Sequence, residues 1–225
     1  MSAAVVFAGP SVRADELQAA AEIELDVRPP VRRGDLEALL QEPDAPRHIG
    51  IVDGEFMQAL MISPKEIVRV IDSGEVRLYG SSSIGALRAV ELAGLGMTGI
   101  GRVVELYRDG VVDADDEVAM IYDRESGRPL CEPMVNIRLA VADGVAAGAI
   151  DAAAGAAAVR VAKGLYYPDR TYATVLRLLA DELEPAQLGA LRDYLMGDPP
   201  NAKRDDAVAL VRRIASDIAR GAGRG

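Results

Sequence analysis

Short apolar runs alternate with helical patterns over the first half of the chain. Strand-like runs cover residues 3–8, 22–27, 48–53 and 77–80, and helical patterns cover residues 14–21, 35–40, 64–72 and a segment that begins near Ile84. This alternation predicts a largely parallel sheet with right-handed crossovers. We therefore expect an α/β fold with three layers, of the Rossmann or flavodoxin-like kind.

Beyond Pro129 the pattern changes to helix throughout. Leu and Val recur at helical spacing in alanine-rich segments, which indicates closely packed helices. The expected helices cover residues 134–147, 151–163, 171–182, 185–196 and 205–220. We predict an α/β core over residues 1–130 and a helical region over residues 131–225 that packs on the core.

The carboxyl ends of the predicted strands carry small and polar residues. In open parallel sheets, ligands collect beyond these ends. The four ends are Gly9-Pro10-Ser11, Pro29-Pro30, Asp53-Gly54-Glu55-Phe56 and Gly80-Ser81-Ser82-Ser83. We expect these turns to converge on one rim. The ligand-binding candidates there are Gly9, Ser11, Asp53, Gly54, Gly80 and Ser81.

The last of these turns is the most informative segment of the chain. A strand, a tight turn and a helix in that order place hydroxyls and free N–H groups at a helix N-terminus, which favours an anion or a developing oxyanion. The order approaches the nucleophile elbow G-x-S-x-G, but the second glycine, Gly85, comes one place late. Ser82 and Ser83 are the candidate nucleophiles.

A serine nucleophile needs a base. The only histidine, His48, stands in a proline-flanked loop entry and is a poor candidate for a triad. A Ser–Lys arrangement that uses Lys65 remains open. Hydroxyls that only bind an anion are the other alternative.

Two groups of charged residues are further candidates. Arg88 and Glu91, at i and i+3 of an apolar helix, either form an intrahelical ion pair or let Arg88 anchor an anion at the serine turn. Asp115, Asp116 and Glu117 belong to an acidic run. It is either a solvated loop, a site for a hard cation such as Mg²⁺, or a contact for a partner or for cationic groups, including Arg88. The spacing of these carboxylates matches no metal loop, so we assign no metal.

The segment Gly94 to Gly101 contains the letters G-x-G-x-x-G. The dinucleotide-binding interpretation requires a strand before the motif, whereas this segment follows a helix. We interpret its glycines as a helix C-cap and a close backbone crossing. No cofactor is expected.

Charge and composition narrow the range of partners. The net charge of −10 and pI near 4.7 argue against nonspecific binding to nucleic acid or anionic membranes, and a basic partner surface is easier to accommodate. One cysteine, Cys131, excludes an internal disulfide and a multi-cysteine metal site. No segment is long enough to span a bilayer, so we expect a cytoplasmic protein.

Several ordered segments together resemble the TfuA-like proteins. They are Gly9-Pro10-Ser11, residues 49–56, Lys65-Glu66-Ile67, residues 79–89, residues 96–101, residues 115–119 and Val135-Asn136-Ile137-Arg138. The resemblance covers about residues 5 to 140. It departs at Tyr122, where a histidine is expected, and at Cys131, where a serine is expected. Tyr122 weakens histidine-based chemistry, and the second departure argues against Cys131 as a sulfur carrier.

The resemblance implies a partner role. TfuA-like proteins accompany YcaO-type ATP-dependent enzymes that modify peptide backbone amides, particularly to thioamides, in the biosynthesis of ribosomally made peptide natural products. Two mechanisms remain open. The chain either releases sulfide by hydrolysing a thiocarboxylated ubiquitin-like sulfur carrier at the serine turn, with Ser82, Ser83, Arg88 and Lys65 as catalytic candidates, or is a non-catalytic partner that activates YcaO and recruits the carrier or a precursor peptide. An unrelated serine hydrolase is disfavoured for want of a histidine base.

Overall fold

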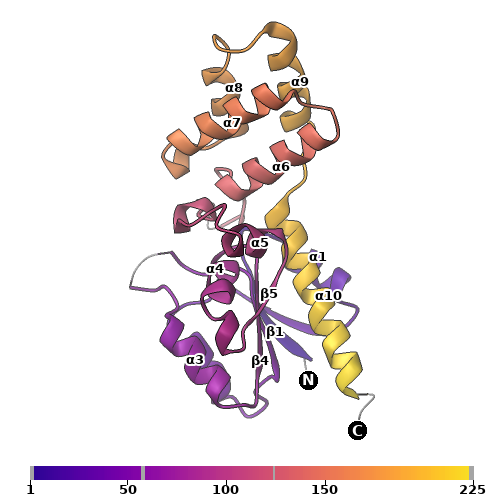
Figure 1. The fold of residues 1–225 in the computed structure, drawn as a ribbon. Coiled ribbons are helices and arrows are strands. Elements are labelled where there is room, and N and C mark those ends of the chain that lie inside the picture. The colour runs from indigo at the N-terminus through magenta and orange to yellow at the C-terminus, as the bar shows by residue number, and fades with distance from the viewer. Residues whose placement is uncertain (1–2, 57–58, 124, 223–225) are drawn as a thin grey trace. The chain divides into compact units, whose positions relative to one another are not determined.

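The computed structural model describes residues 3–56, 59–123 and 125–222 (Figure 1). The chain divides into two compact units, one formed by Met1–Asp115 with Lys203–Gly225 and the other by Asp116–Ala202. The strands of the first unit are β1 (Ala4–Phe7), β2 (Leu25–Arg28), β3 (His48–Ile51), β4 (Arg77–Ser81) and β5 (Thr98–Ile100). Its α-helices are α1 (Ala14–Ala21), α2 (Asp35–Leu40), α3 (Pro64–Asp72), α4 (Ile84–Glu91), α5 (Arg102–Arg108) and α10 (Ala202–Ala222).

Within the described residues the strands form one parallel sheet in the order β2-β1-β3-β4-β5. This is the flavodoxin-like order, so the expected α/β fold is confirmed. The strand order reverses between β1 and β3. The carboxyl ends of these two strands therefore flank the position at which doubly wound sheets bind ligands.

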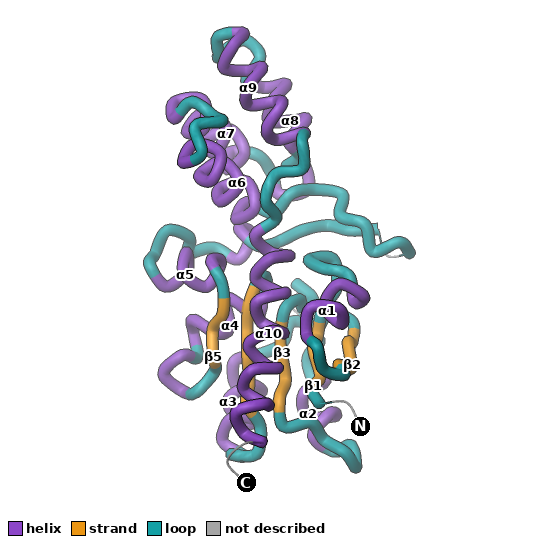
Figure 2. The backbone as a smooth tube through the Cα atoms, turned by 90° about the vertical axis from the view of Figure 1, so that its right-hand side faces the viewer, coloured by secondary structure: helices purple, strands orange, loops and turns teal. Residues whose placement is uncertain are grey.

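Two apolar cores cover the two faces of the sheet. Alternate residues of β1 point to opposite faces: Val5 and Phe7 pack with α2, α3 and α4, whereas Ala4 and Val6 pack with α1 and α10. Figure 2 shows α10 lying along the strands. Its contact with β3 is close, because a Cβ at Gly50 would lie 2.7 Å from Leu210 Cδ2.

The start of α4 rests directly on the backbone of β3. A Cβ at Gly85 would lie 1.8 Å from the carbonyl oxygen of Ile51, so a side chain at this position is excluded. The Gly85 N–H instead donates to the carbonyl of Val52 at 3.3 Å. This contact explains why the second glycine of the elbow-like sequence stands where it does.

The second unit is helical. Its α-helices are α6 (Met134–Ala146), α7 (Ala152–Gly164), α8 (Tyr172–Leu178) and α9 (Pro185–Met196). Leu, Val, Ile and Ala side chains from all four helices form one buried core, in which the small residues of α7 allow close packing. The N-cap of α7 is Asp151, whose side chain accepts from the N–H groups of Ala153 and Ala154.

The structure differs from the sequence prediction in two respects. The glycine segment does cap a helix, since Gly96 is the left-handed C-cap of a short 3₁₀ helix (Ala93–Leu95), but it also contains the edge strand β5, paired with β4, which was not predicted. The predicted boundary at residue 130 also differs from the division observed, because α10 packs its apolar side on the sheet and so belongs to the first unit. Among the described residues, no helix is long and apolar enough to cross a membrane.

Asp206 on α10 joins this helix to α5. Its carboxylate accepts from the backbone N–H of Arg102 at 2.9 Å and from that of Val103 at 2.8 Å. Asp206 is buried, and burial raises its pKa to about 6, although the two N–H donors act in the opposite direction.

This pKa gives a prediction for stability. Because folded Asp206 keeps its proton to a higher pH than it does in the unfolded chain, the folded state binds more protons between pH of about 4 and 6. The contribution of Asp206 to stability is therefore largest below that interval and falls by on the order of 2–3 kcal/mol as the pH rises through it. Urea unfolding of the wild type and Asp206→Asn from pH 4 to 7 should show the stability difference moving in favour of the variant. A difference that does not change with pH would contradict the prediction.

Candidate functional site

The carboxyl ends of β1 and β3 meet at Asp53. The Asp53 carboxylate accepts from the N–H of Gly9 at 2.8 Å, from the N–H of Ser11 at 3.1 Å and from the Ser11 hydroxyl at 2.5 Å. Asp53 and Ser11 are both buried. The turns after the two strands therefore converge, as expected, at the position where the strand order reverses.

Lys203, at the start of α10, places its amine in this buried group. Its Nζ lies 3.2 Å from the Ser83 hydroxyl oxygen and 4.0 Å from a carboxylate oxygen of Asp53. Lys203 and Ser83 are each 1% exposed. A lysine in such a position requires compensation for its charge, and Asp53 supplies a carboxylate.

The serine turn between β4 and α4 is strained. The Ser83 N–H donates to the Ser81 carbonyl at 2.7 Å, and Ser82 between them has a φ of +66°. A hydrogen bond from the N–H of residue i+2 to the carbonyl of residue i defines a γ-turn. When the residue between them has a positive φ, the turn is of the rare, strained type. For a residue other than glycine, such a conformation is uncommon and occurs preferentially at functional sites.

The hydroxyls of this turn do not cap the helix. Ser83 occupies the N-cap position of α4 but makes no side-chain capping bond. The hydroxyls of Ser81 and Ser82 are fully buried, and neither has a hydrogen-bond partner among the described residues. A buried hydroxyl without a partner is destabilising and therefore calls for an explanation.

Two residues considered as bases lie elsewhere. His48 is at the amino end of β3, whereas the serine turn lies at the carboxyl ends of the strands. The His48 Nδ1 lies 3.1 Å from the Tyr79 hydroxyl. Burial lowers the pKa of His48, the charge of Arg77 adds to this, and Asp217 acts against it. Lys65 is exposed on the first turn of α3, so the amine that the structure places on the serine turn is that of Lys203.

Arg88 and Glu91 form an ion pair within α4, with 2.6 Å between Arg88 Nη1 and a Glu91 carboxylate oxygen. The Arg88 Nε also donates to the carbonyl of Ile62 at 3.3 Å. The arginine is buried in these contacts. Of the two sequence alternatives, the intrahelical ion pair is the one that the structure contains.

The acidic run begins in the first unit and continues into the second. Asp115 is exposed, whereas Glu117 is buried and holds both the guanidinium of Arg138, through two hydrogen bonds of 2.9 Å, and the amine of Lys163 at 2.8 Å. Burial alone would raise the pKa of Glu117, but these two cations outweigh it and lower that pKa. Asp116 pairs with Arg170 at 2.6 Å. The cations that these carboxylates position thus belong to the second unit, whereas Arg88 pairs with Glu91.

The remaining rim candidates are backbone positions. Gly54 forms a parallel bridge with Val31, which joins the loops after β2 and β3. Gly80 lies in β4, opposite Ile51 and Gly99. In the part of the chain that the structure describes, no group of three or more His, Cys, Asp or Glu side chains is placed to hold a metal ion.

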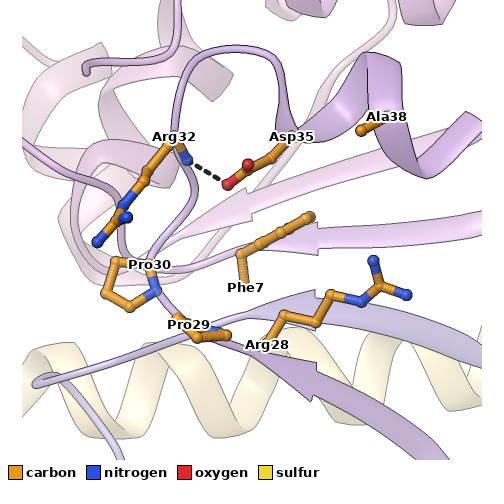
Figure 3. Close-up of a pocket in the computed structure, with 7 residues that line it drawn as sticks. All are labelled: Phe7, Arg28, Pro29, Pro30, Arg32, Asp35 and Ala38. Carbon is orange, nitrogen blue, oxygen red and sulfur yellow. Dashed lines mark hydrogen bonds between the residues drawn. The ribbon is translucent and has the colours of Figure 1, made fainter. Parts of the chain in front are cut away.

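A cavity of about 340 Å³ opens beyond the carboxyl ends of β1 and β2 (Figure 3). Its lining combines apolar and charged side chains: Phe7, Pro29, Pro30, Ala38, Arg28, Arg32 and Asp35. It adjoins the Asp53 group through Pro30, whose Cγ would lie 2.5 Å from a Cβ at Gly9. Arg28 is held by Asp26 and Glu42, and Arg32 contacts Glu55 at 3.1 Å, two residues after Asp53.

The fold and the site together define a flavodoxin-like α/β protein with a buried serine–lysine–aspartate group where its strand order reverses. The family model of TfuA-like proteins matches residues 53–171, a little over half of the chain. The chain belongs to the TfuA-like family. This membership is consistent with a partner role beside a YcaO-type enzyme. Comparison with curated protein sequences gives no match.

The acidic run offers a test of its structural contribution. Glu117→Gln removes the charge shared by Arg138 and Lys163, and because both cations are partly exposed we expect a loss of about 1–3 kcal/mol in unfolding free energy. Asp115→Asn, at an exposed position of the same run, should change it by less than about 0.5 kcal/mol. Urea unfolding of both variants measures the contrast. Equal losses would show that burial of Glu117 is not the cause.

Proposed function

We propose that this protein supplies sulfur to a YcaO-type enzyme during thioamidation of a peptide backbone, by hydrolysing a thiocarboxylated ubiquitin-like carrier at Ser83. The observation that carries this proposal is the contact of 3.2 Å between the Lys203 amine and the Ser83 hydroxyl, at a strained strand-to-helix turn. A nucleophile, a base within hydrogen-bonding distance and a third group beside the base are the parts of an activated serine. Ser83, Lys203 and Asp53 have this arrangement.

The chemistry follows from these groups. The ammonium of Lys203 pairs with Asp53 in the resting protein and must first lose a proton. The amine so formed takes the proton of the Ser83 hydroxyl as the oxygen attacks the carbonyl carbon of the thiocarboxylate. The ammonium so formed returns the proton to the sulfur, and the C–S bond breaks. Hydrosulfide departs, and the acyl group remains on Ser83 as an ester. Water then hydrolyses the ester, so that thiocarboxylate and water give carboxylate, hydrosulfide and a proton. The N-terminus of α4 favours the negative charge that develops on the carbonyl oxygen.

The cavity beyond β1 and β2 supports a route for the carrier tail. It has an apolar floor, lies at the same edge of the sheet as Asp53, and touches the Gly9 turn through Pro30. Its volume of about 340 Å³ suits a few residues of extended chain. In this proposal the tail docks in the cavity and its end reaches Ser83 when the buried group opens.

Sulfide release from a thiocarboxylated carrier tests the catalytic assignment. Ser83→Ala removes the nucleophile and Lys203→Met removes the base, so each should slow release by about 100-fold or more. Lys65→Met should retain the wild-type rate, because Lys65 is exposed on α3. Release is measured as sulfide formed by the pure protein, and again with the YcaO-type enzyme and peptide present.

The thermal midpoint of each variant accompanies its rate, and Lys203→Arg serves as a second variant if Lys203→Met does not fold. Loss of release in Lys65→Met alone would assign the base to Lys65. Full release by both Ser83→Ala and Lys203→Met would exclude the proposed chemistry.

The burial of Ser83, Lys203 and Asp53 favours a second function. In it, the protein is a non-catalytic partner that activates YcaO and recruits the carrier or a precursor peptide. The three groups proposed to act in catalysis are at most 2% exposed, as expected of a structural ion pair. In that case the variants would keep thioamidation in the reconstituted system as long as they remain folded.

Filling the cavity tests where the carrier docks. Ala38 is exposed on α2 and lines the cavity, so Ala38→Trp should obstruct it. We expect a several-fold higher KM for the carrier with little change in kcat, because binding is weakened while Ser83 and Lys203 are untouched. Ala19→Trp, at an exposed position of α1, is the matched control. An equal KM in the two variants would place the docking site elsewhere.

A further inference from the structure

The hydroxyls of Ser81 and Ser82 make no hydrogen bond in the described structure that would stabilise the folded protein. Both side chains are 0% exposed, and neither oxygen has a partner among the described residues. Alanine at either position would remove a buried unpaired hydroxyl without changing the backbone. The turn nevertheless keeps both, next to the nucleophile proposed above.

The surroundings of these hydroxyls favour a negative group. They immediately precede the N-terminus of α4, an eight-residue helix whose dipole is positive at this end. The N–H groups of Gly85, Ala86 and Leu87 already donate to backbone carbonyls, so this helix end contributes its dipole and not free donors. The Lys203 amine lies 3.2 Å from the hydroxyl oxygen of the adjacent Ser83. The nearest carboxylate of the group, Asp53, already accepts three hydrogen bonds from Gly9 and Ser11, so it does not compete for the two hydroxyls.

The space beside the hydroxyls restricts the size of the ligand. A Cβ at Gly80 would lie 2.1 Å from the Gly85 carbonyl oxygen, so strand and helix are in backbone contact on one side of the turn. Both hydroxyl oxygens are enclosed by protein atoms. A ligand that reaches these oxygens must therefore be small and shielded from water.

We propose that Ser81 and Ser82 form a binding site for the hydrosulfide anion, and that this site holds the sulfur after it leaves the carrier. The inference rests on the proposed function for the origin of the sulfide. Two hydroxyl donors, a helix N-terminus and an ammonium group together stabilise a small anion in a water-excluded site. Sulfur retained there passes to the next acceptor instead of escaping into solution.

Hydrosulfide binding is measured without any carrier. The backbone amide signals of residues 80–86 are followed by NMR while sodium hydrosulfide is added anaerobically, with sodium chloride at equal ionic strength as the reference. The wild type should show a saturable shift confined to these residues. Removal of each hydroxyl, in Ser81→Ala and Ser82→Ala, should weaken binding by about tenfold, as expected for one hydrogen bond to a charged group. Ser73→Ala, which alters a hydroxyl bonded to the Val70 carbonyl, should bind as the wild type does.

Urea unfolding of the serine variants is a second test, for which a structural role of the two hydroxyls predicts the opposite result. Without ligand, Ser81→Ala and Ser82→Ala should unfold at the same or a higher urea concentration than the wild type, because a buried unpaired hydroxyl is removed. A lower midpoint in both would mean that these hydroxyls hold the turn together, and would overturn the proposal. The absence of saturable hydrosulfide binding, or equal binding by the double alanine variant, would overturn it as well.

The two proposals fail separately. If the wild type hydrolyses the carrier but does not bind hydrosulfide, catalysis stands and the sulfide site is wrong. If hydrosulfide binds at residues 80–86 while Ser83→Ala still releases sulfide from the carrier, the sulfide site stands and the catalytic assignment is wrong.

Discussion

The backbone contact between α4 and β3 determines the geometry of the candidate site. Because a Cβ at Gly85 would lie 1.8 Å from the Ile51 carbonyl oxygen, only glycine lets the helix begin so close to the sheet. The chain then has only Ser82 and Ser83 with which to pass from the end of β4 into α4. It does so through the γ-turn observed, with its positive φ at Ser82. The strain of the serine turn is therefore a consequence of where the helix is held.

A buried charge places a second constraint on the same region. Lys203 is 1% exposed, and an ammonium group without a counter-charge would be strongly destabilising at that depth. Asp53 at 4.0 Å supplies this counter-charge, and its own oxygens are satisfied by the Gly9–Ser11 turn. One polar group thus links β1, β3, α4 and α10. It anchors the start of α10, a helix that comes late in the chain, to the carboxyl edge of the sheet.

The sequence predicted the parts of the site that depend on local patterns. Apolar runs that end in glycine and a polar residue mark the carboxyl ends of parallel strands, so Ser11, Asp53 and the serine turn could be placed on one rim. Lys203 could not be found in this way. It lies 120 residues from Ser83, among surface-like charges just before the predicted helix at residues 205–220. The strand β5 was missed because three residues, Thr-Gly-Ile, are too short to show a period of two.

The stability of the fold explains the Lys203–Asp53 pair of the site but not the hydroxyls of the serine turn. The pairing of Lys203 with Asp53 fastens α10 to the sheet, so stability is a sufficient reason for its presence. The strain of the serine turn follows from the position of α4, but its buried hydroxyls lack such a reason. Positions with positive φ elsewhere in the described chain are mostly glycine, as at Gly74 and Gly148, whereas Ser82 keeps a side chain there. That side chain and its neighbour then bury hydroxyls that bond to nothing in the described structure. Because buried hydroxyls without partners destabilise the folded chain, the physical argument for a ligand rests on Ser81 and Ser82 and not on Lys203.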